Sequence, residues 1–361
     1  MSLFHFDLNS IKYNNVRPIG SGEVIRRIIG KATTTLLKPD IVSATAPIQT
    51  CGGLKGGIEA SIHAMREIFE ESGCEGILLI DAQNAFNSLN RKAALHNIQY
   101  ECPEFARYIR NLYKGKAELF VQNSEDIVWS EEGTTQGGPE SMGFYAVSTM
   151  QLARVNGRLK IILYADDKAG AGKLEELAKL WKESFEDGPP LGYFPYDKKT
   201  ILITKPEFLE KAKELFPDIT ITTVGHEYLG SFLGSEEGKK MFVDEQVEEW
   251  TKDIEALVEI ARSEPQLAYC AYIFGTSKRW QFVCRTTPGV GIYLQKLEDL
   301  IRSKLIPAIV GIEFISDEMR KIFSLPARLG GLGFLNPVIE ADLDYEDSLA
   351  VTAQLTRAIY N

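Results

Sequence analysis

The chain is poor in histidine and in paired cysteines, and it has no long apolar segment. Four histidines are scattered through 361 residues, and the five cysteines include no Cys-x-x-Cys pair. A His/Cys zinc site is therefore not expected, and an odd, scattered set of cysteines indicates free thiols in a reducing compartment. No apolar run approaches the roughly 20 residues of a membrane-spanning helix. Because the N-terminus also lacks the features of a signal peptide, we expect an intracellular protein, cytoplasmic or nuclear.

Positive charge is also in short supply. Lysine and arginine total 40 against 50 acidic residues, which gives a formal net charge of −10. The acids concentrate in segments 235–259 and 340–347, which we expect to be outer faces. Polyanion binding depends largely on phosphate neutralisation, so an acidic chain would need a locally basic groove, and we expect such binding to be weak and salt-sensitive.

Two familiar site patterns are incomplete. Segment 169–174 hints at a phosphate loop, but Asp167 stands where the first glycine of that motif belongs. Leu174 stands where its Ser or Thr should follow the lysine. Segment 63–67 has one histidine in the wrong order for a zinc helix. Neither a phosphate loop nor a zinc helix is therefore predicted.

Two adjacent carboxylates stand at a predicted hairpin turn. The segment Tyr164-Ala165-Asp166-Asp167 follows the apolar, β-prone run 159–163, and glycines follow at 170 and 172. This pattern predicts strand, tight turn and second strand. Like charges repel at short range, so a nearby cation would stabilise the pair, and hard oxygen ligands suit Mg²⁺. The alternative is an ordinary solvated turn, because Asp is a favoured turn residue.

A further carboxylate ends a second apolar run. Residues 76–80 carry no polar side chain and predict a buried strand that delivers Asp81 at its end. The following segment is predicted to begin as a turn and become helical by about Arg91. If the two strands are neighbours, Asp81 and Asp166 converge and would hold two divalent ions about 4 Å apart, as in-line nucleotidyl transfer requires. The alternative for Asp81 is an N-cap or turn aspartate.

Several motifs occur in the order and rough spacing of the reverse transcriptase palm. They are Asp81 with Phe86, Gln136-Gly137-Gly138-Pro139, the Tyr164–Asp167 turn, and Lys199-Thr200. The chain resembles reverse transcriptases of eukaryotic mobile elements, of the non-LTR or DIRS-like type. The resemblance extends to Val16–Gly20, similar to a fingers motif, to Glu227-Tyr228-Leu229-Gly230, similar to the primer grip, and to the tail 326–333. It therefore covers nearly the whole chain.

The resemblance implies a role for each matching residue. Asp81 and Asp166 would bind two Mg²⁺ ions, with Mn²⁺ as a second option. Asp167 would be a weaker third ligand, and the backbone carbonyl of Ala82 would join them. Phe86 matches the aromatic steric gate, whose ring lies against C2′ of the incoming sugar and excludes a 2′-hydroxyl by a clash. The alternative is that Phe86 is simply a core residue.

The glycine-rich segment 132–139 would approach the nucleotide closely. The resemblance implies that Gln136 contacts the sugar, that Gly137 faces the template-primer, and that Tyr164 belongs to the substrate-binding set. The chain departs from the family at the next positions. Gly138 stands where an Asp is usual, and Glu140 stands where an apolar residue is usual.

Basic residues supply the remaining candidates. Lys199 would protonate the pyrophosphate leaving group, a step that typically accelerates a reaction by about 10²–10⁴-fold. Lys198 is nearly as plausible for this role by its position, and the alternative for Lys199 is an ordinary solvated lysine. Arg17 matches the fingers residue over the incoming base and triphosphate, and guanidinium suits phosphate binding. Arg27 and Lys31 would share one face of a helix.

The expected fold is α+β, a polymerase right hand. Residues 1–75 would form fingers, residues 76–235 an antiparallel-sheet palm with inserted fingers elements, and residues 236–361 a helical thumb with a C-terminal extension. Apolar residues recur at helical spacing in the last segment and predict core packing. They are Val243, Val247, Trp250, Ile254, Leu257 and Val258.

The expected function is RNA-directed DNA polymerisation. The partners would be an RNA template, a DNA or RNA primer and dNTPs, without a membrane and with protein partners unspecified. An RNA-dependent RNA polymerase on the same palm is the alternative enzyme, and Phe86 argues against it. A non-catalytic, domesticated scaffold of the same fold is the alternative of another class.

Overall fold

The chain forms two compact units of mixed helix and sheet. The computed structural model describes residues 2–5, 19–121, 127–153 and 159–360. The first unit comprises 1–222 with the C-terminal residues 355–361, and the second comprises 223–354. The predicted α+β class is confirmed, with helix in the majority. Arg17, the predicted fingers residue, lies outside the described residues.

The first unit is built on a five-stranded sheet of order β6-β7-β3-β8-β9. Neighbouring strands are antiparallel except for β8 and β9, which are parallel. The hairpin and the buried strand predicted from sequence are both present, side by side. The strands are β6 (Lys160–Tyr164), β7 (Asp167–Gly172), β3 (Gly76–Ile80), β8 (Ile201–Thr204) and β9 (Thr220–Thr222).

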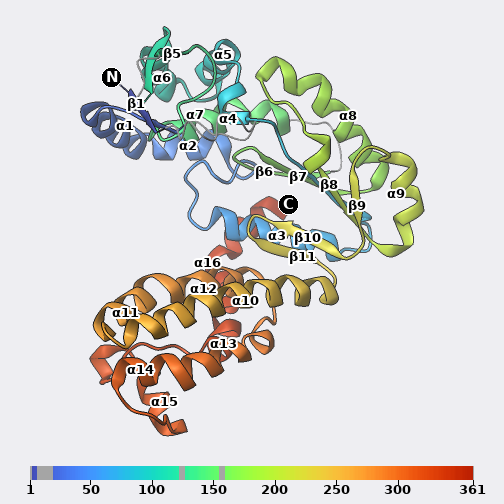
Figure 1. Ribbon diagram of the computed structural model, residues 1–361. Coiled ribbons are helices and arrows are strands. Elements are labelled where there is room, and N and C mark those ends of the chain that lie inside the picture. The colour runs from blue at the N-terminus through green and yellow to red at the C-terminus, as the bar shows by residue number, and fades with distance from the viewer. Residues whose placement is uncertain (1, 6–18, 122–126, 154–158, 361) are drawn as a thin grey trace. The chain divides into compact units, whose positions relative to one another are not determined.

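Helices cover both faces of this sheet (Figure 1). On one face, α8 (Leu174–Leu191) packs with Leu78 of β3 in the main hydrophobic core. The approach is close at Gly170, where a Cβ would stand 2.5 Å from a methyl carbon of Leu180. On the other face lies α3 (Gly57–Glu70), whose Ile62 is fully buried. Burial on both faces explains the unbroken apolar run that predicted β3.

A second sheet and further helices complete the first unit. Its strand order is β2-β1-β4-β5, and β1 and β4 are parallel. The strands are β1 (Ser2–His5), β2 (Ile19–Ser21), β4 (Ala117–Val121) and β5 (Ile127–Ser130). The helices are α1 (Val24–Leu36), α2 (Lys38–Thr45), α4 (Ala85–Ser88), α5 (Arg91–Glu101), α6 (Pro103–Tyr113), α7 (Ser141–Ser148) and α9 (Leu209–Leu215), with 3₁₀ turns η1 (Met150–Ala153), η2 (Asp197–Lys199) and η3 (Pro206–Phe208).

The apolar segment that follows the glycine-rich loop forms an α-helix only in its first part. Helix α7 ends at Ser148, and the 3₁₀ turn η1 follows it. The Tyr145 carbonyl accepts from the Thr149 N–H at 3.1 Å and also from the Thr149 hydroxyl at 2.8 Å, and such a bond from the side chain to the preceding turn tends to bend a helix.

The second unit is a two-stranded hairpin followed by helices, coloured gold to red in Figure 1. The six apolar residues predicted to recur at helical spacing, from Val243 to Val258, lie on α10. Each of them is buried, so their predicted role in the core is confirmed. The elements are β10 (Gly225–Tyr228), β11 (Ser231–Gly234), α10 (Glu236–Ala261), α11 (Pro265–Ala271), α12 (Ser277–Thr286), α13 (Gln295–Leu300), α14 (Ile306–Val310), α15 (Asp317–Ser324) and α16 (Pro337–Tyr360), with π-helical turns η4 (Tyr272–Thr276) and η6 (Ile301–Leu305) and 3₁₀ turns η5 (Gly291–Tyr293) and η7 (Ala327–Leu329).

Two expectations drawn from what the sequence lacks can be compared with the structure. All five cysteines are free. Within the described ranges, none of the helices combines the length and the apolar character needed to cross a bilayer.

Candidate active site

The predicted carboxylates meet at one edge of the five-stranded sheet. Tyr164 of β6 pairs with Asp167 of β7, which leaves Ala165 and Asp166 as the turn between the strands. Ile80 of β3 pairs with Lys168 of β7, so the next step of this register sets Asp81 opposite Asp167. The register therefore places the backbone of all three residues at one edge of the sheet, and the strands that carry Asp81 and Asp166 are neighbours, as the prediction required.

A buried glutamine is hydrogen-bonded to the backbone of this turn. Ala165 has φ 57°, a conformation uncommon outside glycine. The side chain of Gln49 is fully buried; its amide donates to the Ala165 carbonyl at 3.0 Å, and its carbonyl accepts from the Ala165 N–H at 2.9 Å. The backbone on either side of Gln49 also bonds to Leu163 of β6. Sequence reasoning missed Gln49; the one signal was a glutamine directly after the apolar residues 46–48.

A buried tyrosine lies close to the backbone that carries these carboxylates. The Tyr193 hydroxyl lies 3.3 Å from the carbonyl oxygen of Asp166 and 3.5 Å from that of Ile80. Burial raises the pKa of Tyr193 well above its ordinary value, and the charges of Asp166, Asp167 and Asp81 add to the rise. The phenol therefore stays protonated and donates to the backbone. Tyr193 follows Gly192 just after α8, and nothing local in the sequence singled it out.

Lys199 reaches the carboxylate of Asp81. Its ammonium lies 3.6 Å from an Asp81 oxygen, and it also lies 5.9 Å from the centre of the Tyr196 ring. The Lys199 side chain is 61% exposed and that of Asp81 29%, so the ion pair adds little stability and leaves the lysine free to move. The structure thus brings Lys199 to Asp81, whereas the backbone N–H of Lys198 donates to the Asp197 carboxylate at 2.8 Å.

Phe86 lies between a tyrosine ring and the glycine-rich loop. Its half-buried ring stacks on Tyr145, with centroids 4.4 Å apart and planes at 18°. The Phe86 carbonyl accepts from the N–H of Thr134 at 2.7 Å, two residues before Gln136. Gly133 has φ 72°, and a Cβ there would collide with the carbonyl of Asn87. The predicted gate and the predicted nucleotide loop are therefore directly hydrogen-bonded to each other.

A buried arginine anchors the approach to this loop. The guanidinium of Arg91 donates to the carbonyls of Ser130, Glu132 and Gly133 at distances from 2.7 to 3.2 Å. It also lies 4.9 Å from the centre of the Tyr113 ring. Gln136 is half-buried beyond this anchor, and Gly137 is exposed with φ 98°. Sequence reasoning treated Arg91 only as the start of a helix and missed this role.

Glu140, the departure noted in the sequence, is buried at the start of α7. It is 1% exposed, and in the described part of the chain its Oε2 has no hydrogen-bond partner. Burial raises its pKa, against an opposing effect of Arg26. A carboxyl thus occupies a position where an apolar side chain would fit.

The donor set suits Mg²⁺ that arrives with a substrate. Across residues 2–5, 19–121, 127–153 and 159–360, three or more His, Cys, Asp or Glu side chains do not form a ready-made metal cage. Mg²⁺ at phosphate-transfer sites is usually held by one or two carboxylates together with substrate phosphates, so a converging carboxylate pair fits it. Ala82 lies opposite Pro195 in an isolated antiparallel bridge. The two hydrogen bonds of this bridge run from the Gln83 N–H to the Phe194 carbonyl and from the Tyr196 N–H to the Asp81 carbonyl, so the Ala82 carbonyl takes no part in them.

The predicted primer-grip residues form the hairpin turn of the second unit. Tyr228 pairs with Ser231, so Leu229 and Gly230 make the turn, with φ 51° and 80°. Positive φ at both positions is typical of a type I′ hairpin. The neighbouring Ser231 hydroxyl lies 2.8 Å from that of Thr287 and fixes the hairpin to the end of α12.

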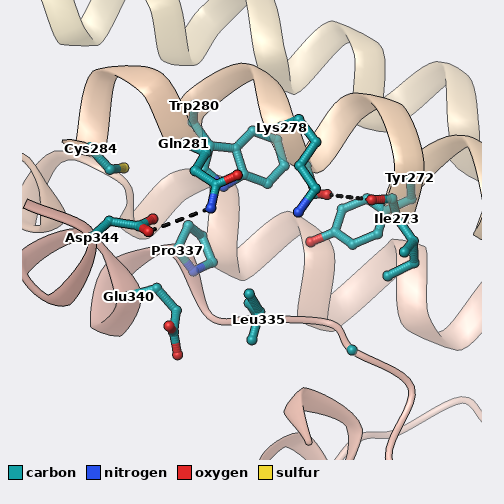
Figure 2. A pocket seen from close by; sticks show the side chains of 12 residues that line it. Tyr272, Ile273, Lys278, Trp280, Gln281, Cys284, Leu335, Pro337, Glu340 and Asp344 are labelled. Atoms are coloured by element: carbon teal, nitrogen blue, oxygen red, sulfur yellow. Dashed lines mark hydrogen bonds between the residues drawn. The ribbon is translucent and has the colours of Figure 1, made fainter. Parts of the chain in front are cut away.

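The second unit also contains a small pocket of about 60 Å³, open to solvent (Figure 2). Trp280 and Gln281 of α12 line it, together with Glu340 and Asp344 of α16. The Gln281 amide points toward Asp344, at 3.5 Å. Burial raises the pKa of both carboxyls, with mutual repulsion adding to the effect for Glu340. None of the residues predicted from sequence lines this pocket.

Comparisons with known proteins give remote structural likeness only. No protein-family model and no curated protein matches the chain. Apo telomerase from Candida tropicalis is similar over 93% of this chain and 60% of its own, with 11% identity and a TM-score of 0.43. Telomerase from Candida albicans, in complex with a fragment of telomeric RNA, covers 93% of this chain and 56% of its own, with 9% identity and a TM-score of 0.40.

These neighbours are telomerases, and telomerase is a reverse transcriptase. The chain spans less than two thirds of their length. Similarity at this level assigns neither a family nor an activity to this chain, and it carries nothing about a mobile-element origin.

Proposed function

We propose that the chain is an RNA-directed DNA polymerase that adds dNTPs to a primer 3′-hydroxyl on an RNA template. The observation that carries this proposal is the β3–β7 register, which sets Asp81 opposite Asp167 beside the turn residue Asp166. The five-stranded sheet is the palm of the proposed enzyme, with fingers before it and the helical second unit as thumb.

The carboxylates would hold the metal ions of the reaction. Asp81 and Asp166 are the main ligands, Asp167 the weaker one, and the Ala82 carbonyl completes the set. Two Mg²⁺ ions bound there, or Mn²⁺, would supply activation of the primer hydroxyl and neutralisation of the reacting phosphate. Tyr193 keeps the backbone beneath this set in place, since its hydroxyl bonds the Asp166 carbonyl.

The remaining side chains bind and select the nucleotide. Lys199 protonates the departing pyrophosphate, and its exposure allows it to leave Asp81 and reach that oxygen. Phe86 excludes a ribose 2′-hydroxyl, and its stacking on Tyr145 gives the ring a firm backing. Gln136 contacts the sugar, with Gly137 and Tyr164 beside the nucleotide.

Other elements of the proposal rest on the sequence resemblance. Arg17 covers the base and triphosphate, and Tyr228, Leu229 and Gly230 grip the primer. The source would be a eukaryotic mobile element of non-LTR or DIRS-like type, acting inside the cell in the cytoplasm or the nucleus.

Primer extension on an RNA template tests the proposal. With Mg²⁺, the wild-type chain should incorporate dNTPs, and Asp166→Asn should abolish incorporation. The matched control is Asp197→Asn, an exposed aspartate of η2 that belongs to none of the proposed ligands. Undiminished incorporation by Asp166→Asn would refute the metal assignment.

The same assay separates the two alternatives. An RNA-dependent RNA polymerase would prefer NTPs, whereas the proposed enzyme should accept them only after Phe86→Ala removes the ring. A non-catalytic scaffold would bind RNA without extending a primer under any of these conditions.

A further inference from the structure

The turn that carries Asp166 is held by two side chains that lie far from it in sequence. Gln49 precedes Ala165 by 116 positions, and Tyr193 follows Asp166 by 27. Both are essentially buried, at 0% and 2% exposure, so water does not compete for their hydrogen bonds.

Gln49 acts as a substitute strand partner for the turn. Residues 48–50 run parallel to β6: the Ile48 carbonyl accepts from Leu163 N–H at 2.8 Å, and Thr50 N–H donates to the Leu163 carbonyl at 2.9 Å. Beyond Leu163 this backbone pairing stops. The Gln49 amide then makes the next two bonds itself, to the N–H and the carbonyl of Ala165.

Tyr193 fixes the following residue. Its hydroxyl lies 3.3 Å from the Asp166 carbonyl oxygen. The N–H and carbonyl of Ala165 and the carbonyl of Asp166 are thus all bonded, so the peptide planes on both sides of the Asp166 Cα are restrained. These bonds restrain the position of the Asp166 Cα and the direction in which its side chain leaves the backbone.

We propose that Gln49 is a positioning residue that holds the Asp166 carboxylate in the geometry needed for metal binding and nucleotidyl transfer, with Tyr193 as its counterpart. This inference rests on the proposed function. Residues that orient a metal ligand without touching the metal typically change metal affinity or activity by 10–100-fold when they are removed.

Gln49→Met is the appropriate variant, because methionine keeps the length and volume of the side chain and removes both hydrogen bonds. The matched control is Asn97→Leu, which removes another buried amide of the first unit. Asn97 is 5% exposed and donates to the Ser148 carbonyl at 3.0 Å, with no contact to the turn. Thermal unfolding of both variants identifies the loss that is merely structural.

Two readouts then distinguish positioning from stability. In primer extension, Gln49→Met should lower kcat by about 10–100-fold and raise the half-saturating Mg²⁺ concentration, with the KM for dNTP little changed. With a dNTP present but no primer or template, Mn²⁺ titration followed by electron paramagnetic resonance should show binding to the protein that Asp166→Asn removes and that Gln49→Met weakens about tenfold or more. Asn97→Leu should leave both readouts at the wild-type value.

The outcomes separate this inference from the proposed function. If the wild-type chain extends the primer and Gln49→Met gives the same two readouts as Asn97→Leu, the positioning role is overturned and the proposed polymerase is not. Mn²⁺ binding that depends on Asp166 and Gln49, without any primer extension, would support the positioning role and overturn the polymerase. Absence of Asp166-dependent Mn²⁺ binding would overturn the positioning role in its stated form.

Discussion

The buried ion pair between Arg320 and Glu298 should dominate the stability of the second unit. The guanidinium donates to both carboxylate oxygens, at 2.7 and 2.6 Å, and each side chain is only 6% exposed. It also donates to the carbonyls of Phe334 and Leu335, so it joins α13 to the chain segment that follows the glycine-rich tail. Arg320→Met keeps the aliphatic stem and removes every one of these donors.

The expected loss follows from what the substitution leaves behind. An uncompensated buried carboxylate typically costs about 3–5 kcal/mol. In the double variant Glu298→Met/Arg320→Met the charge is gone, and only the two backbone carbonyls lose their donor. A buried acceptor without a partner costs about 1–3 kcal/mol. The double variant should therefore be more stable than Arg320→Met alone, although it carries more changes.

Urea denaturation of the full chain measures both variants. Tryptophan fluorescence reports on this unit because Trp250 and Trp280 belong to its core. The control is Arg262→Met, which breaks the exposed pair with Glu259, where the side chains are 69% and 65% exposed and the expected loss is below about 1 kcal/mol. A loss in Arg320→Met no larger than in Arg262→Met would refute the reasoning, as would a double variant less stable than Arg320→Met.

Three further predictions concern the first unit. Burial lowers the pKa of Lys168 from 10.5 to about 8. Between these two values the unfolded chain binds more protons than the folded chain, so the free energy of unfolding should rise with pH by about 3 kcal/mol. Urea titrations from pH 7 to 10 should show this rise for the wild-type chain and not for Lys168→Met. Burial raises the pKa of Glu140, so stability is lost as pH rises through that pKa, and Glu140→Gln should gain stability at pH 7 but little at pH 4. Lys199→Ala should lower kcat in primer extension by about 10²–10⁴-fold, whereas Lys199→Arg should keep substrate binding.

The elements that periodicity predicts are those whose burial pattern is local. Strand β3 is an uninterrupted apolar run because helices cover both faces of its sheet. The stripe on α10 repeats at helical spacing because one face of a single helix packs into the core. In both cases the sequence near each residue carries enough information to place it.

The supports of the candidate site are not local, and so they could not be predicted. Gln49, Arg91 and Tyr193 each act through hydrogen bonds to backbone groups, which are chemically the same at every residue. Arg91 bonds carbonyls about 40 positions away, and Gln49 bonds one 116 positions away. A single sequence shows which side chain can form a hydrogen bond but does not show which backbone group it bonds. Only the tertiary pairing of β6, β7 and β3 reveals which backbone groups need a partner.

The placement of charge bears on how an acidic chain could carry the proposed site for an anionic substrate. The acids of α10 and α16 lie at exposed or half-exposed positions, as expected for outer faces. At the sheet edge, the uncharged side chains of Gln49 and Tyr193 instead bond the backbone of Ala165 and Asp166, and the exposed ammonium of Lys199 lies 3.6 Å from Asp81. A salt bridge in place of Gln49 would compete with the proposed divalent cation for the neighbouring carboxylates, whereas an uncharged amide holds the turn without that competition.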